Sequence, residues 1–290
     1  MTVTTTAAPT TSLDASSATG VTATGLLRSE WIKFWTLRST IWTLGLTVVL
    51  MVGLAVLFAF GATTSLGETD ANDPGVTMGI ESAAGLVGMG TFLAQIAVAV
   101  LGVLTITGEY STGMIRSTLA AAPRRLPALW AKVAVVAASV SAVAVVSTVL
   151  GTLLTLGFHD RLGITLDLAD GETQRLLAGI PLYLAGLALL GLAFGALLRS
   201  SAGAIATVLG LTLLLEAMVA AIPFRVFEVI SPFLPTTAGQ RLLTDDASLA
   251  EMDAVATAAT LSPWQGYAVL LAWVAILLGI AAVLLRRRDA

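Results

Sequence analysis

The sequence predicts an all-α membrane protein with six transmembrane helices, preceded by an amphipathic interfacial helix and with both chain ends on the cytoplasmic side. The mean hydropathy is +0.92, and only 11% of the residues are charged. Soluble domains carry about 25% charged residues. A chain with so few charges has too little polar surface to cover itself in water, so lipid must surround most of it.

Six windows are long and apolar enough to cross a bilayer. A spanning helix needs about 20 mostly apolar residues. The windows lie at roughly 41–60, 83–107, 133–157, 176–198, 203–222 and 266–285. We expect helices there because backbone groups in lipid must satisfy their own hydrogen bonds. The alternation of a membrane β-strand is absent from these windows.

The distribution of basic residues predicts the orientation. Lys and Arg accumulate in cytoplasmic loops. With the N-terminus inside, eleven of the fifteen basic residues fall inside, and four fall outside, namely Arg161, Arg175, Arg225 and Arg241. The reverse orientation would place eleven cations outside, so we expect both termini to be cytoplasmic.

The residues before the first window divide into two parts. Residues 1–24 are rich in Thr, Ala and Ser, without the apolar core or leading basic residues of a secretory signal, and predict a disordered tail. Residues 25–40 predict an amphipathic elbow helix at the membrane surface. Its candidate interfacial residues are Trp31, Lys33, Phe34, Trp35 and Arg38. On a helix, Trp31, Phe34 and Trp35 share an apolar face that is expected to lie toward the membrane, and Glu30 and Lys33 lie on the polar face. Such a helix is either an anchor alone or also a contact for a cytoplasmic partner.

A basic segment, GEYSTGMIRSTLAAAPRRLPALWAK, covers residues 108–132 between the second and third windows. It predicts a short helix broken at Pro123, with the third span beginning after Lys132. Its cations either set topology only or serve a docking surface. The second reading is favoured by a length unusual for a bundle connection and by apolar side chains such as Met114 that need cover.

Two stretches, SEWIKFWTLRST at 29–40 and GEYSTGMIRSTLAAAPRR at 108–125, resemble bacterial type-2 ABC transporter permeases, the membrane subunits of ABC exporters. The resemblance extends over the six-span layout after residue 24. It implies that 108–132 contains a coupling helix that docks on a separate ATPase subunit. The implied coupling residues are Glu109, Tyr110, Thr112, Gly113, Arg116 and Thr118, with Arg124 and Arg125 flanking the contact or meeting lipid headgroups.

The same resemblance implies a second permease protomer, as a homo- or heterodimer, in the bacterial plasma (inner) membrane. The chain itself is expected to be no enzyme and to bind no cofactor, because it has no G-x-x-x-x-G-K-[ST] phosphate loop and ATP would be bound by the partner. Lipid is an expected partner and nucleic acid is not. The cargo class stays open between amphiphiles, peptides, lipids and glycans, although the low polarity of the spans favours a hydrophobic cargo.

Two other classes compete with this function. An ion-coupled secondary transporter needs several intramembrane charges and broken helices, whereas the predicted spans offer the acid Glu216 and the weaker polar residue Gln95. A membrane anchor or sensor would share the topology but move nothing. An intramembrane enzyme is disfavoured by the lack of Cys and by a single histidine, His159.

Small residues predict close helix contacts within the spans. Gly191 and Gly195 have small-xxx-small spacing in the fourth window, with Gly186 before them, and Ala275 and Gly279 have it in the sixth. The segment 223–265 carries several prolines among apolar residues and predicts short helices that partly re-enter the membrane.

Overall fold

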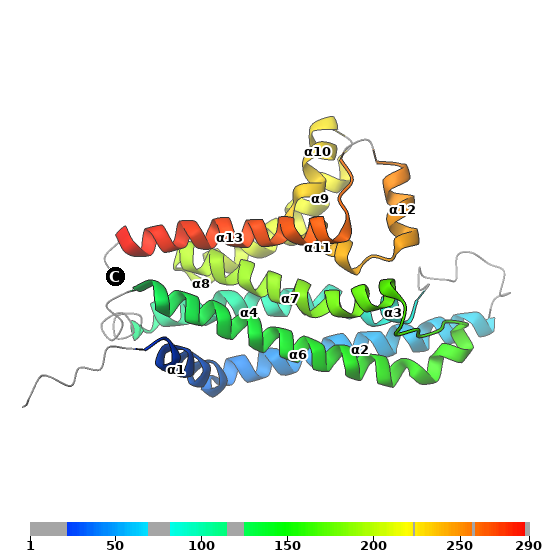
Figure 1. The fold of residues 1–290 in the computed structure, drawn as a ribbon, viewed down its shortest axis with the longest axis horizontal. Coiled ribbons are helices and arrows are strands. Elements are labelled where there is room, and N and C mark those ends of the chain that lie inside the picture. The colour runs from blue at the N-terminus through cyan, green and yellow to red at the C-terminus, as the bar shows by residue number, and fades with distance from the viewer. Residues whose placement is uncertain (1–21, 69–81, 115–124, 223, 257–258, 288–290) are drawn as a thin grey trace, which may run out of the picture.

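The computed structural model describes residues 22–68, 82–114, 125–222, 224–256 and 259–287, and they form an all-helical bundle (Figure 1). The first half comprises α1 (Ala23–Thr36), α2 (Arg38–Glu68), α3 (Ala83–Gly88), α4 (Thr91–Ser111) and α6 (Arg125–Leu162). The second half comprises α7 (Gly171–Leu198), α8 (Ser201–Leu209), α9 (Glu216–Ala221), α10 (Arg225–Ile230), α11 (Pro235–Gln240), α12 (Asp246–Ala254) and α13 (Pro263–Arg287).

Six of the described helical segments are long and apolar enough to span a membrane, which confirms the predicted fold class. They are Arg38–Thr64, Thr91–Ser111, Leu126–Leu162, Gly171–Leu198, Ser201–Ala221 and Pro263–Arg287. The fifth span joins α8 and α9 through a π-helical segment, Gly210–Leu215. Each span overlaps one of the six apolar windows of the sequence.

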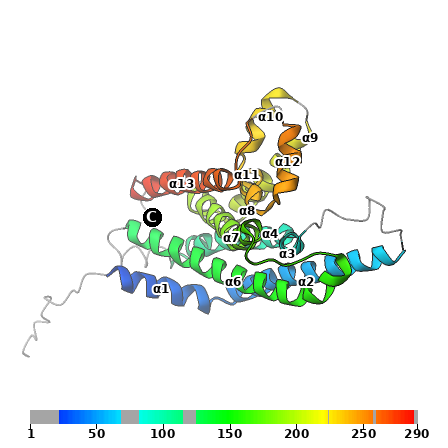
Figure 2. The same ribbon diagram turned by 45° about the vertical axis from the view of Figure 1, so that its right-hand side comes forward.

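The described start and end of the chain lie at the same end of the bundle, as six crossings require (Figure 1). The end of α4, the start of α6 and the turn from α7 to α8 lie at this end too, whereas α3, α10 and α12 lie toward the other (Figures 1 and 2). The assignment of this end to the cytoplasm stays a prediction.

The core of the bundle is α7, which packs against α4, α6 and α13. The backbones of α4 and α7 approach each other closely because glycines on both helices have no side chain. A Cβ on Gly191 would lie 2.1 Å from the Ala99 carbonyl oxygen, and one on Gly102 would lie 1.9 Å from that of Ala188. The packing predicted for the fourth window is confirmed. A Cβ on Gly279 would meet nothing within 4 Å, so Gly279 makes no tight helix contact within the protomer despite its spacing from Ala275.

Three helix boundaries differ from the prediction. The second window is divided into α3 and α4 near Gly90, where a Cβ would lie 2.3 Å from the Met51 carbonyl oxygen. The third span begins at Leu126, not after Lys132, because Pro127 lies in the first turn of α6, where its missing N–H needs no partner. The elbow helix ends at Thr36, so Arg38 begins α2.

The segment before the last span consists of short helices, as predicted. Pro232 and Pro235 occupy first-turn positions of a 3-10 helix, Ser231–Phe233, and of α11, where proline is favoured. In Figure 1 α10 and α12 project away from the bundle, while α11 packs against α13.

Candidate functional site

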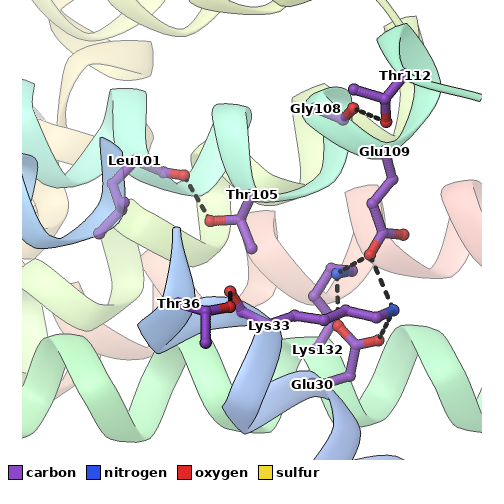
Figure 3. A network of polar contacts seen from close by, with 9 residues as sticks. All are labelled: Glu30, Lys33, Thr36, Leu101, Thr105, Gly108, Glu109, Thr112 and Lys132. Atoms are coloured by element: carbon purple, nitrogen blue, oxygen red, sulfur yellow. Dashed lines mark hydrogen bonds and ion pairs between the residues drawn. The ribbon is translucent and has the colours of Figure 1, made fainter. Parts of the chain in front are cut away.

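Four charged residues from three helices form a buried network at the end of the bundle where α1 lies (Figure 3). Lys132 Nζ lies 2.6 Å from Glu30 Oε2 and 2.9 Å from Glu109 Oε1. Lys33 Nζ lies 2.7 Å from Glu30 Oε1 and 3.3 Å from Glu109 Oε1. Two ammonium groups and two carboxylates are therefore joined by four described ion-pair contacts.

Each helix contributes to this network at a defined point. Glu30 and Lys33 lie three residues apart on α1, Glu109 lies in the last turn of α4, and Lys132 lies near the start of α6. Glu30, Glu109 and Lys132 are only 3%, 6% and 6% exposed. The network thus ties the elbow helix to both described ends of the basic segment.

The elbow helix differs from the prediction in two side chains. Its polar side faces the bundle, with Glu30 and Phe34 both buried, while Trp31 and Trp35 are 47% and 37% exposed. Phe34 therefore does not share the face of the two tryptophans. The physical reason is that α1 packs against α6, so the charges pair inside the protein and the aromatic rings turn outward.

The network shifts two ionisation equilibria. Burial alone raises the pKa of the Glu30 carboxyl, but the charge of Lys132 and hydrogen bonds from Lys132 and Lys33 outweigh burial and hold that pKa below its ordinary value. Burial alone lowers the pKa of the Lys33 ammonium, but its hydrogen bond to Glu30 and the charge of Glu109 raise that pKa above its ordinary value. Both groups are held in their charged forms.

A cavity of about 500 Å³ adjoins the network. Its walls come from α1, the corner between α1 and α2, the last turns of α4, and α6. One carboxylate oxygen, Glu109 Oε2, is buried without a hydrogen-bond partner among the residues that the structure describes.

The predicted coupling residues fall into three groups. Glu109 is buried in the network, and the Tyr110 ring lies under the Arg199 guanidinium, 5.2 Å from it, at the turn after α7. Thr112 and Gly113 are exposed, and Gly113 has a φ of 72°, which favours glycine. Arg116, Thr118 and Arg124 lie outside the described residues, and Arg125 is placed only as the first residue of α6.

Sequence reasoning missed the partners of Glu109. Glu30 was placed on the polar face of the elbow helix without a partner, and Lys132 was counted among the cations of the basic segment. A usable signal was present, since Glu109 is the one acid of the basic segment and Glu30 and Lys33 have the spacing of a helical ion pair.

The two intramembrane polar residues also find partners. Glu216 accepts hydrogen bonds from the backbone N–H groups of Thr236 and Thr237, at 2.8 and 2.6 Å, and from the Thr237 hydroxyl at 2.7 Å. It therefore caps α11 rather than pairing with a cation. Gln95 Oε1 accepts a 2.7 Å hydrogen bond from the buried Tyr183 hydroxyl. Neither pairing was predictable from the spacing along the chain.

The six candidate membrane spans define a multi-pass membrane protein. Residues 26–290 match the family model described as ABC-2 family transporter protein, so the chain belongs to the ABC-2 family. The predicted resemblance is confirmed, and the protein is a membrane permease component of a transporter, a non-catalytic subunit. No curated protein matches the chain.

Proposed function

We propose that the chain is the permease subunit of an ATP-driven exporter in a bacterial plasma membrane, coupled through segment 108–132 to a separate ATPase subunit. Membership of the ABC-2 family supports the ATP-driven assignment, because permeases of this family typically pair with an ABC ATPase. The observation that carries the coupling assignment is the buried network, which joins both described ends of the segment to α1.

The network gives a physical route for force. A displacement of segment 108–132 acts on the end of α4 and the start of α6 together, because Lys132 bonds Glu109 and both helices bond α1 through Glu30 and Lys33. The end of α4 also contacts the turn after α7, where the Ser201 hydroxyl donates to Thr107 Oγ1 at 2.8 Å. Movement at the segment therefore reaches the core span α7.

Burial divides the coupling residues by role. Glu109 is buried and Tyr110 is half-buried, so they position the segment, whereas the exposed Thr112 and Gly113 face the partner. The remaining contacts to the ATPase fall to Arg116, Thr118, Arg124 and Arg125. The exposed Trp31 and Trp35 seat the elbow helix among lipid headgroups.

A dimer completes the translocation path. One protomer supplies six spans, and two protomers enclose a path of twelve with one ATPase subunit beneath each. Closure of the two ATPases on ATP would bring the two coupling segments together and bias the spans between inward- and outward-facing states.

The test is co-purification of an ATPase subunit with the detergent-solubilised chain from its native membrane. Arg116→Ala combined with Arg124→Ala is expected to lose the ATPase that wild type retains. Arg286→Ala is the matched control, because Arg286 is an exposed cation at the end of α13, on the same end of the bundle. Equal ATPase recovery by wild type and the double variant would refute the docking assignment. Transport that needs no ATPase and follows an ion gradient would instead support a secondary carrier.

A further inference from the structure

An open groove of about 380 Å³ lies on the outside of the bundle, where α1 and the first half of α6 pack side by side (Figures 1 and 2). Its described lining is apolar except for one guanidinium, and it consists of Leu27, Arg28, Trp31, Ala134, Val135 and Ala138. The groove is separate from the buried charge network, because it opens on the surface of the two helices.

Two alanines form the floor of the groove. Ala134 and Ala138 lie four residues apart, on one face of α6, and both are exposed. The floor therefore follows the axis of α6 for about 6 Å. It presents only methyl groups, so it matches a slender hydrocarbon chain that lies along the helix.

Two indoles place the groove at a definite depth in the membrane. Trp31 on α1 and Trp130 on α6 are 47% and 48% exposed. Exposed indoles gather at the level of the lipid headgroups. Ala138 lies eight residues beyond Trp130, about 12 Å farther along α6, and so reaches the hydrocarbon region. An occupant with a polar head and a hydrocarbon chain fits both levels.

The head of the occupant is selected by Arg28. This residue is exposed and makes no hydrogen bond or ion pair with the residues that the structure describes. Within a bilayer, one lipid tail is as apolar as another, so the tail gives little selectivity. A guanidinium binds phosphate through paired hydrogen bonds. A zwitterionic head carries its own cation beside the phosphate, whereas an anionic head leaves the phosphate charge to Arg28.

We propose that this groove binds an anionic glycerophospholipid. The Arg28 guanidinium donates to its phosphate, and the Trp31 indole N–H, which donates to no other described residue, donates to an ester carbonyl. One acyl chain lies over Ala134 and Ala138. The bound lipid braces α1 against α6 beside the buried network. The site does not depend on coupling to an ATPase.

The experiment uses the full protein in nanodiscs of phosphatidylcholine and phosphatidylglycerol with the same acyl chains. One of the two lipids at a time carries dibrominated acyl chains, which quench nearby indoles. The readout is the part of the tryptophan quenching that Trp31→Phe removes. Wild type is expected to favour phosphatidylglycerol about fivefold at this site, the factor typical of one arginine near an anionic lipid.

Two variants separate the contact with the head from the contact with the tail. Arg28→Gln is expected to reduce the preference for phosphatidylglycerol to within about 1.5-fold of parity, whereas Arg286→Gln, which changes an exposed cation on α13, keeps it. Ala134→Leu combined with Ala138→Leu fills the floor and is expected to lower the quenching of Trp31 by either lipid about twofold. Ala272→Leu, at an exposed alanine of α13, is the control for added bulk.

Four results would overturn the proposal. The preference could persist in folded Arg28→Gln, or be equally large for the tryptophans that remain in Trp31→Phe, which would mean a general attraction of anionic lipid. Trp31 could be quenched by neither lipid, which would give the groove to a protein. Excess inorganic phosphate at constant ionic strength could abolish the preference, which would assign Arg28 to a soluble anion. Arg28→Gln changes an exposed side chain, so the test does not depend on the folding of the alanine variants.

Discussion

Replacing Lys132 by Met removes the ammonium that bonds both buried acids while keeping a long, unbranched apolar stem. The lost contacts are 2.6 Å to Glu30 Oε2 and 2.9 Å to Glu109 Oε1. Removing one partner of a buried ion pair costs about 3–5 kcal/mol, since the other charge stays buried. Two charge-assisted hydrogen bonds at about 1.5–3 kcal/mol each lead to a similar figure. We expect the free energy of unfolding to fall by about 3–5 kcal/mol.

The assay is an SDS titration in mixed micelles, followed by tryptophan fluorescence, on four proteins that form a double-mutant cycle. They are wild type, Lys132→Met, Glu30→Gln and the double variant. The stability loss of the double variant is expected to be about 1.5–3 kcal/mol smaller than the sum of the two single losses, because the double variant removes one charge of each sign. Arg286→Met is the control, since an exposed cation contributes within about 0.5 kcal/mol.

A loss below about 1 kcal/mol for Lys132→Met would refute the reasoning, because a side chain 6% exposed between two acids could not then be a buried partner. Strict additivity in the cycle, within about 0.5 kcal/mol, would show that Lys132 and Glu30 act independently.

Four further predictions concern the acid dependence of the network, the glycine contacts, the cap of α11 and the Gln95–Tyr183 hydrogen bond. Because its folded pKa is depressed, Glu30 contributes stability that is present above its ordinary pKa of 4.5 and is lost as pH falls through the folded value, so the melting temperature should fall more steeply in acid for wild type than for Glu30→Gln. Gly102→Ala forces a Cβ against backbone and should cost about 1–3 kcal/mol, whereas Gly279→Ala, with open space around it, should gain up to about 1 kcal/mol in the same SDS titration. Glu216→Ala leaves two backbone N–H groups at the start of α11 unpaired and should cost about 2–4 kcal/mol, with faster proteolysis of the segment before the last span; unchanged cleavage would contradict the capping role. Tyr183→Phe leaves the Gln95 amide oxygen without its donor and should lower stability by about 1–3 kcal/mol, which thermal melting would measure.

The spans were predictable from the sequence because lipid imposes a length and a composition on every crossing helix. The close packing at Gly191 and Gly195 was predictable for a related reason, since small residues at that spacing permit contact between helix backbones. The spacing could not say which neighbour the glycines meet. Gly279 on α13 has the same pattern, but a Cβ there would meet nothing within 4 Å, so the tertiary structure and not the spacing decides which glycines make contacts.

The candidate site was only partly predictable. Glu109 was singled out from the motif, but its burial follows from Lys132, 23 residues away in the chain, and from Lys33, 76 residues away. A hydrophobicity pattern reports one helix at a time and cannot tell whether a polar face meets water or another polar face. The same limit applied to Glu216, whose partners belong to α11.

By itself, the sequence determined the class of the protein, the number and approximate position of its spans, the elbow helix and the segment that resembles a coupling helix, because all of these depend on local composition and short motifs. Only the tertiary structure decided which way the elbow helix turns, which charges neutralise one another and where a cavity remains. Those features depend on contacts between α1, α4 and α6, and a contact between distant segments is a property of the assembled bundle, not of any one stretch of the chain.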